Sequence, residues 1–245
     1  MPRRRVASLN AALERDRPVL AKLGALMPPQ PHYPRAVERT ADGVVHAIGL
    51  VGAALGGGLL LGLAFGEDRP GMAVALGIYA ASLVLMFGCS AAYNFSSERV
   101  RPWLRRLDHA AIFIMIAGSY TPFTALRLHG LWAIGMTGAV WTLALIAAVG
   151  KLLAPGLDRK LWIGLYLALG WIALFAFKPL YATVSLAALA LLLAGGLVYS
   201  AGVIVYLKRT LPFRRAIWHG FVLAAAAAHY AAILMGVVLA APGAA

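Results

Sequence analysis

Seven long runs without a charged side chain divide this chain of 245 residues. A helix that crosses the roughly 30 Å of hydrocarbon in a bilayer needs about 20 mostly apolar residues. Only helices and closed barrels satisfy their backbone groups in lipid, and these runs lack the alternation of barrel strands. The runs are 43–65, 71–93, 109–126, 130–150, 161–177, 179–207 and 216–240. We therefore predict an all-α integral membrane protein, a bundle of seven transmembrane helices over 43–245 with no soluble domain.

Composition agrees with a membrane protein. Hydrophobic residues make up 62% of the chain and charged residues 13%, against about 45–50% and about 25% in soluble domains. Cys89 is the single cysteine, which excludes a disulfide framework and a thiolate metal cluster. We interpret it as a small apolar residue of a helix.

The positive net charge of +13 raises the question of nucleic-acid binding, but its distribution argues for orientation instead. With the N-terminus inside, 19 of the 22 Lys and Arg residues fall in cytoplasmic segments, and only Arg69, Arg127 and Lys178 fall outside. Such a bias sets the orientation of a membrane protein. We predict a cytoplasmic N-terminus, an outer C-terminus, membrane lipids as partners and no nucleic-acid partner.

The first 42 residues are predicted to be a cytoplasmic segment. Three arginines follow Pro2, but no apolar stretch of a signal peptide comes after them. Residues 8–26 are interpreted as a candidate helix on the inner membrane surface, and 27–34 as a proline-rich linker. Further along, glycines four residues apart at Gly52/Gly56, Gly58/Gly62 and Gly62/Gly66 are expected to let helices approach closely.

Function is expected where polar residues enter the apolar runs, because such residues are costly in lipid and usually face the bundle interior. Four pairs stand at the predicted cytoplasmic ends of spans: Asp42 with His46, Ser90 with Asn94, Asp108 with His109, and Arg215 with His219. In three pairs a spacing of four puts both side chains on one helix face. The four pairs predict one shared site, and His229 stands apart, about 15 Å deeper along the seventh span.

Each residue also has a structural interpretation that remains open. Asp42 would cap its helix, Ser90 would bond to its own helix, and His109 would face the headgroups. Arg215 would extend to the cytoplasm, and His229 would be an interior histidine with a hydrogen bond. Asp108 is the exception, because it is the only acid close to the apolar body of the second to seventh spans.

Several segments resemble the bacterial hemolysin III proteins, which belong to the wider progestin and adiponectin receptor (PAQR) superfamily. They are VVHAIG (44–49), SAAYN (90–94), LDHAAIFIMIAGSYTPF (107–123), FKP (177–179) and AIWHGFVLAAAAAHY (216–230). The resemblance runs from about residue 36 to residue 240. It implies seven helices and a cytoplasmic N-terminus, in agreement with the charge distribution.

For members that carry metal, the resemblance implies a zinc ion held by three histidines near the cytoplasmic side. One histidine ends the second span in a pattern like SxxYH, and two open the seventh as HxxxH. The resemblance also implies catalytic support from Asp108 and Ser90, and some members resemble lipid-amide (ceramide) hydrolases. Three histidines leave one zinc position open for a water, whose pKa falls to about 7.

This sequence departs from that pattern at two positions. Asn94 stands where the histidine of the second span is expected, and Arg215 stands at the first histidine position of the seventh span, so only His219 is retained. Arginine is no metal ligand and neutral asparagine is a poor one. We therefore expect a degenerate site without a cofactor, in which Arg215 pairs with Asp108 while Asn94 and His219 complete the hydrogen bonds.

The leading hypothesis is a hemolysin III family protein of the bacterial inner membrane, with a degenerate or remodelled metal site, that binds lipid or modulates the membrane without hydrolysis. A second hypothesis is a ceramidase-like, metal-dependent lipid-amide hydrolase with a rearranged site, in which zinc would be held by His46, His109, Asp108 and His219. A third is a pore former or cytolysin, although a chain of seven apolar spans is poorly suited to secretion as a soluble toxin.

Overall fold

The structure, a computed structural model, describes residues 31–66, 69–154, 156–208 and 210–240. The chain divides into two units, residues 1–35 and 36–245. The candidate surface helix at 8–26 lies outside the described residues. In the first unit, residues 31–35 form neither helix nor strand, and the rings of His32 and Tyr33 pack edge to face with centroids 5.0 Å apart.

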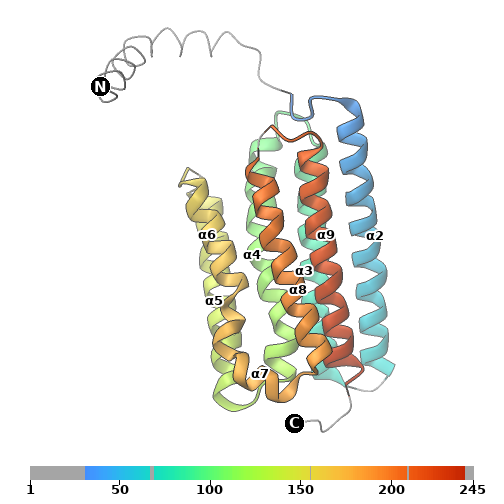
Figure 1. Cartoon of the computed structure of the whole chain (residues 1–245), viewed down its shortest axis with the longest axis vertical. Helices are drawn as coiled ribbons and strands as arrows, with labels where there is room; N and C mark the ends of the chain where they lie inside the picture. Colours follow the sequence, from blue (N-terminus) through green and yellow to red (C-terminus); the bar gives the residue numbers. More distant parts are fainter. Residues whose placement is uncertain (1–30, 67–68, 155, 209, 241–245) are drawn as a thin grey trace, which may run out of the picture. The chain divides into compact units, whose positions relative to one another are not determined.

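The second unit consists of long helices that run up and down one bundle (Figure 1). Its elements are α2 (Ala36–Gly66), α3 (Pro70–Phe95), α4 (Arg101–Leu126), α5 (Gly130–Leu153), α6 (Arg159–Gly170), η1 (Ile172–Ala176), α7 (Phe177–Thr183), α8 (Leu186–Leu207), α9 (Arg214–Ile233) and the π-helical turn η2 (Leu234–Val238). Within the described ranges, seven helical segments are long and apolar enough to cross a membrane, with α6 to α7 counted as one and α9 with η2 as another. The predicted seven-helix transmembrane bundle is confirmed.

Local sequence explains where several helices begin. Pro70 occupies the first turn of α3, where its missing N–H costs nothing. The Asp158 side chain accepts a hydrogen bond from the Lys160 N–H at 2.9 Å and caps α6. The Ser185 side chain does the same for α8 by accepting from the Ala188 N–H at 3.3 Å.

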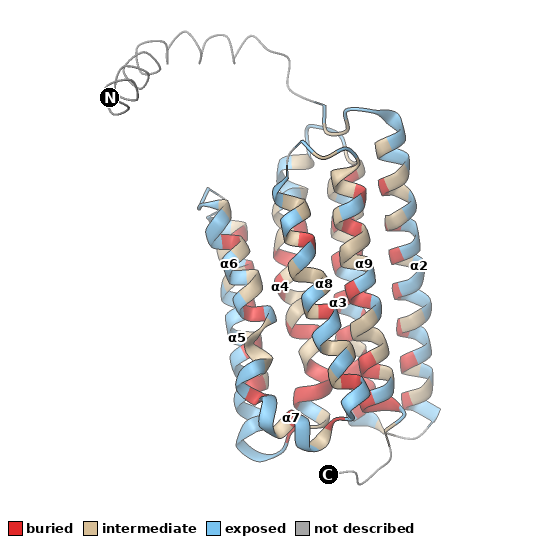
Figure 2. Ribbon diagram, viewed as in Figure 1, coloured by how far each residue is buried: buried red, intermediate tan, exposed pale blue. Residues whose placement is uncertain are grey.

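The first helix shows why the bundle suits a bilayer. Its buried residues recur every three or four positions, as expected of one helix face: Asp42, His46, Gly49, Ala53, Gly57, Leu60 and Ala64. Its exposed face is apolar and includes Val44, Ile48, Val51, Leu55 and Leu59. Figure 2 shows the buried residues of α2 along the side that faces the bundle. Apolar side chains that point outward require lipid as their solvent.

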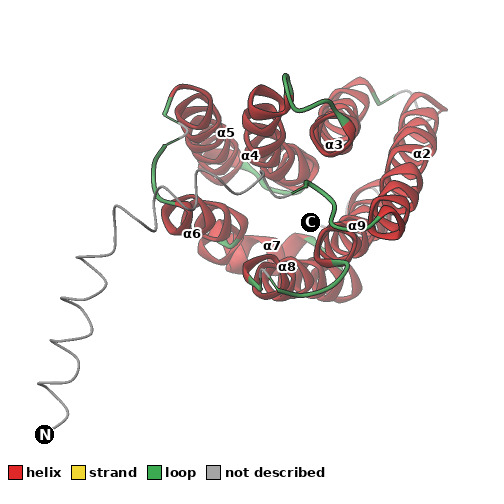
Figure 3. Cartoon of the chain, turned by 90° about the horizontal axis from the view of Figure 1, so that it is seen from above, coloured by secondary structure: helices red, strands yellow, loops and turns green. Residues whose placement is uncertain are grey.

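Seen from above, the helices follow one another around the bundle, and α9 packs against both α8 and α2, which closes the arrangement (Figure 3). The first and last long helices of the bundle are therefore neighbours. The core is built mainly from apolar side chains of α3, α4, α5 and α9, with Tyr79 and Phe113 among its largest fully buried members.

Two predictions about the elements need correction. The break between the fifth and sixth spans, predicted near Lys178, lies at Val184 and Ser185. The exposed Lys178 sits within α7, because a long cationic side chain near a helix end reaches water without ending the helix. Pro179 falls in the first turn of α7, where it is tolerated.

The close helix contacts also lie at different glycines from those expected. An added Cβ would meet nothing within 4 Å at Gly52, Gly58, Gly62 or Gly66. The tight contacts of α2 are at Gly49, where a Cβ would come within 2.6 Å of the Phe87 ring, and at Gly57, where it would come within 2.8 Å of Ala80. Of the expected glycines, only Gly56 lies close to a neighbour, Tyr230.

Candidate functional site

Six polar side chains gather at the end of the bundle where α2, α4 and α9 begin and α3 ends. We call them the polar cluster: Asp42, His46, Ser90, Asn94, Asp108 and His219. None of the six is more than 9% exposed. They come from four helices, each within about three turns of a helix end, and they include at least one member of each of the four predicted pairs.

Asp42 contacts both histidines of the cluster. Its Oδ1 lies 2.6 Å from His219 Nδ1, and its backbone carbonyl oxygen lies 2.8 Å from His46 Nδ1. The distance from Oδ1 to His46 Nδ1 is 3.7 Å. The contact with His219 joins residues 177 positions apart in the chain, and it ties the start of α2 to the start of α9.

A count of hydrogens shows how the two rings are oriented. A carbonyl oxygen only accepts, so His46 Nδ1 must carry the hydrogen, and Nε2 of the neutral ring then holds a lone pair. An ionised carboxylate also only accepts, so the same holds for His219. Both Nε2 atoms face Ser90 Oγ, at 3.0 Å from His46 and 3.4 Å from His219. One hydroxyl hydrogen serves at most one of these lone pairs, which leaves at least one basic nitrogen available to a cation or a proton.

Asn94 and Arg215, the two replaced ligand positions, bond to each other. Arg215 donates from a guanidinium nitrogen to Asn94 Oδ1 at 3.5 Å. Asn94 Nδ2 in turn donates to the Ser90 carbonyl at 3.0 Å, with Ser90 Oγ at 3.4 Å.

The expected ion pair between Arg215 and Asp108 is absent within the part of the chain that the structure describes. Helix α9 packs mainly against α8 and α2 and only slightly against α4. Its Arg215 side chain donates to Asn94, near the end of α3, instead. Asp108 still feels the guanidinium at longer range, together with His219, Ser90 and Arg105.

Two of the predicted histidines lie apart from the polar cluster. The charged groups that act on the His109 ring are Lys151 and Arg105, and no hydrogen bond among the described residues joins that ring to the cluster. His229 Nε2 lies 3.3 Å from the Leu192 carbonyl oxygen on α8. His229 is thus an interior histidine with a hydrogen bond, as its structural interpretation expected.

Asp42, His46 and His219 form a group that could hold a metal ion, since one ligand atom of each lies within 4.8 Å of the others. Two imidazoles and a carboxylate are a donor set that suits zinc. Asp108 lies outside this group, although the sequence had placed it in the substitute ligand set. Sequence reasoning named His46 as a substitute ligand but Asp42 only as a lining residue. Their spacing of four, on the face that turned out to be buried, was the available signal.

Comparison with known proteins finds a family model and several relatives that are similar to this chain. The model of the family described as Haemolysin-III related matches residues 35–230. The chain is 34% identical over 198 residues to "Hemolysin-3 homolog" of Bacillus subtilis (strain 168), which covers 80% of this chain and 93% of that protein. It is also 34% identical over 201 residues to "Hemolysin-3" of Bacillus cereus, covering 80% and 90%. "Monocyte to macrophage differentiation factor" of Homo sapiens is 30% identical over 210 residues, covering 82% and 85%.

Proposed function

Since the chain belongs to the Haemolysin-III related family, we propose that it is a metal-dependent hydrolase of lipid amides, with its metal centre moved onto Asp42, His46 and His219. The observation that carries the proposal is the buried group of three ligands within 4.8 Å. It favours the hypothesis of a rearranged site over that of a degenerate one. The amide substrate comes from the resemblance of some members of the superfamily to ceramide hydrolases.

The residues of the polar cluster would have different roles in this reaction. A divalent ion held there would polarise the substrate carbonyl and make a bound water more acidic. Without an ion, Asp42 holds the His219 ring through its carboxylate and the His46 ring through its carbonyl oxygen. As a ligand, the Asp42 carboxylate would bind the ion in place of the hydrogen on His219 Nδ1, and the carbonyl oxygen would still orient His46. Asp108, on the neighbouring helix α4, would take a proton from the attacking water and pass it to the leaving amine. The water oxygen thereby bonds to the carbonyl carbon, and the carbon–nitrogen bond breaks.

Depth in the membrane supports a lipid substrate. Asp42 lies six residues after the start of α2, which corresponds to about 9 Å along the helix axis. A helix that enters the headgroup region at its first residue, with that region roughly 6 Å thick on each side of the hydrocarbon, would carry the cluster near the inner boundary of the region. The linkage between the headgroup and the acyl chain of a lipid lies at that depth.

Metal analysis and turnover on the purified full chain test the proposal together. We expect about one zinc per chain and hydrolysis of a short-chain fluorescent ceramide that a chelator abolishes. Asp42→Asn, His46→Gln and His219→Gln should each lower both readouts, whereas His229→Gln, a change of an interior histidine outside the cluster, should lower neither. A chain without metal and without turnover would contradict the proposal.

A second function has its own support. The Asp42–His219 hydrogen bond of 2.6 Å and the contact between Arg215 and Asn94 satisfy much of the cluster without an ion. This observation favours a protein that binds a lipid without cleaving it. Recovery of one lipid species bound to metal-free protein, identified by mass spectrometry, would favour this function.

A further inference from the structure

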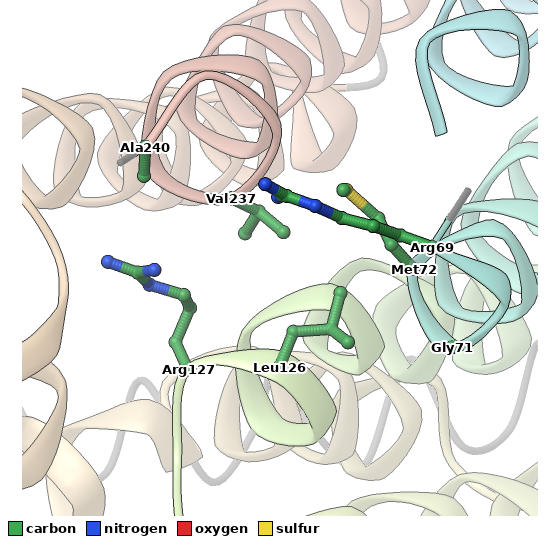
Figure 4. A pocket seen from close by; sticks show the side chains of 7 residues that line it. All are labelled: Arg69, Gly71, Met72, Leu126, Arg127, Val237 and Ala240. Atoms are coloured by element: carbon green, nitrogen blue, oxygen red, sulfur yellow. The ribbon is translucent and has the colours of Figure 1, made fainter. Parts of the chain in front are cut away.

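Basic side chains lie at both ends of the bundle, in different surroundings. At the end away from the polar cluster, Arg69 and Arg127 line a cavity of about 310 Å³ between α3, α4 and the end of α9 (Figure 4). At the end that carries the polar cluster, Lys151 is covered by its neighbours and only 7% exposed. A lysine is almost never buried to this extent unless its charge has a partner. The surroundings of Lys151 are separate from the residues of the proposed function.

The Lys151 ammonium has an aromatic neighbour and no hydrogen-bond acceptor. Lys151 lies in the last turn of α5, and its Nζ is 4.5 Å from the centroid of the Trp162 ring on α6. A contact with an aromatic face is electrostatic and uses none of the three N–H donors in a hydrogen bond to oxygen or nitrogen. Within the part of the chain that the structure describes, no atom accepts a hydrogen bond from Nζ. The charged group that acts on Lys151 is Arg105 of α4, another cation.

The groups around Lys151 are donors as well. Nε1 of Trp162 is buried and has no acceptor among the described residues. Arg105 is exposed, and together with Lys151 it acts on the ring of His109. Donors that share surroundings of low polarity without an acceptor are costly. An anion with several oxygen atoms would supply both acceptors and negative charge.

The helices that carry these groups are tied to one another. The Tyr166 hydroxyl of α6 donates to the His109 carbonyl oxygen of α4 at 2.9 Å. Arg106 of α4 donates to the Leu152 carbonyl oxygen of α5 at 3.5 Å. Side chains on a frame that is already assembled lose less conformational freedom when they bind a ligand.

The chain itself offers few acids here. From the start of α4 to the end of α6 the sequence contains only Asp108 and Asp158. Asp158 is exposed and caps α6 by accepting from the Lys160 N–H. Asp108 belongs to the polar cluster, and it is not among the groups that act on Lys151. Neither acid therefore balances the charge of Lys151.

The location favours a phosphate group. Lys151 lies near the end of one membrane-spanning helix and Trp162 near the start of the next, which is the level of the lipid headgroups. The neighbouring side chains of Leu153 and Leu161 are exposed and apolar, so hydrocarbon contact continues beside the charged groups. Basic pockets between spanning helices suit phosphate-bearing headgroups. We propose that Lys151, with Arg105, binds a phosphate group where α4, α5 and α6 meet, supplied either by an anionic phospholipid or by free phosphate.

The full chain in nanodiscs, made of phosphatidylcholine alone or with added phosphatidylglycerol, tests the proposal. Retained lipid is counted by native mass spectrometry, and melting is recorded with and without inorganic phosphate. We expect Lys151→Met and Arg105→Gln each to weaken anion binding about tenfold, as for a lost charge-assisted contact. Lys160→Gln is the matched control, because Lys160 is an exposed cation at the same end of the bundle and does not act on Lys151.

Melting adds a sign that a merely structural lysine would not give. Without an anion, Lys151→Met should melt no lower than the parent chain, because methionine keeps the apolar stem and removes a buried charge that lacks an acceptor. The anion should raise the melting temperature of the parent and leave that of Lys151→Met unchanged. A large loss of stability for Lys151→Met in phosphatidylcholine, with no response of the parent to either anion, would contradict the proposal.

The two arms separate the sources of the phosphate group. Retention of phosphatidylglycerol that depends on Lys151 and Arg105, without a response to inorganic phosphate, assigns the site to a lipid headgroup. A response to inorganic phosphate in phosphatidylcholine nanodiscs, lost in both variants, assigns it to the free ion. If both variants behave like Lys160→Gln in both arms, Lys151 binds no anion. Arg105 is exposed, so Arg105→Gln keeps the test valid if Lys151→Met fails to fold.

Discussion

Asp42 orients two imidazole rings at once, through its side chain and through its own backbone. The carboxylate is fully buried and holds His219, while the carbonyl oxygen holds His46. A substitution at this position removes only the first of these contacts. The consequence for stability can therefore be assigned to one hydrogen bond of a charged group.

We predict that Asp42→Ala lowers the free energy of unfolding by about 1.5–3 kcal/mol, the range for a hydrogen bond to a charged group. Melting in detergent with a chelator present measures the effect without a contribution from metal. Glu98→Gln serves as the control, because Glu98 is an exposed acid whose contact with Arg101 is 4.0 Å long and should be worth less than about 0.5 kcal/mol. Equal losses for the two variants would contradict the role given to Asp42.

A variant of Asp108 should distinguish an effect on the catalytic step from an effect on metal binding. We predict that Asp108→Asn lowers kcat for amide hydrolysis by about 10²–10⁴, the range for a lost general acid–base group, while the zinc content stays unchanged. His229→Phe should affect turnover far less, because His229 bonds to α8 away from the cluster. Loss of zinc from Asp108→Asn would show that this aspartate is a ligand and not a proton carrier.

Much of the candidate site could be predicted from single residues, and its internal pairing could not. Polar residues near the ends of apolar runs indicated Asp42, His46, Ser90, Asp108 and His219, because burial of such groups in lipid is costly. Which of them touch depends on the rotation and neighbours of each helix. The pattern within one helix does not contain that information. For this reason the partner of Arg215 was assigned to Asp108, whereas the structure gives Asn94.

At the scale of the helices, α8 and α9 depend on a contact between Gly195 and His229. A Cβ added at Gly195 would overlap the His229 ring and come within 3.2 Å of the Ala225 carbonyl oxygen. His229 is at the same time held by the Leu192 carbonyl oxygen, so its ring has little room to move. The glycine therefore sets how closely the two helices approach.

We predict that Gly195→Ala destabilises the protein by about 1–3 kcal/mol, the usual cost of overpacking. The double variant Gly195→Ala/His229→Ala should lose less than the sum of the two single variants, because the small residue makes room for the new methyl group. Gly58→Ala is the control, since nothing lies within 4 Å of its added Cβ and alanine favours a helix by about 0.5–1 kcal/mol. Strict additivity in a melting assay would count against this contact.

Helix number followed from the lengths of the apolar runs, since the thickness of the bilayer sets the length of a span. The helix boundaries and the contacts between helices were predicted less well from the sequence. Gly49 and Gly57 pack closely although the repeated spacing of four pointed to other glycines. Glycine spacing does not say which face of a helix meets protein and which meets lipid. The buried positions of α2 supply that information through Asp42 and His46, whose polarity marks the inner face.

At the scale of the whole molecule, the charge distribution makes a prediction about orientation. The 19 basic residues of the predicted inner segments include those at the end of the bundle that carries the polar cluster. We predict that residues 1–42 and the polar cluster face the cytoplasm of a bacterial cell and that Ala245 lies outside. A fusion at residue 245 to a reporter that is active only outside the cytoplasm should be active. Activity of a cytoplasmic reporter at that position would reverse the assignment.

The contact between α2 and α9 also sets the order in which the protein can become functional. Asp42 and His219 are 177 residues apart, and at a synthesis rate of about 5–20 residues per second the second leaves the ribosome roughly 10–35 s after the first. During that interval Asp42 and His46 have no partner from α9. A metal ion with three ligands can therefore be captured only after the last helix has been inserted and docked. The bound ion would mark a finished chain, and a truncated product would carry none.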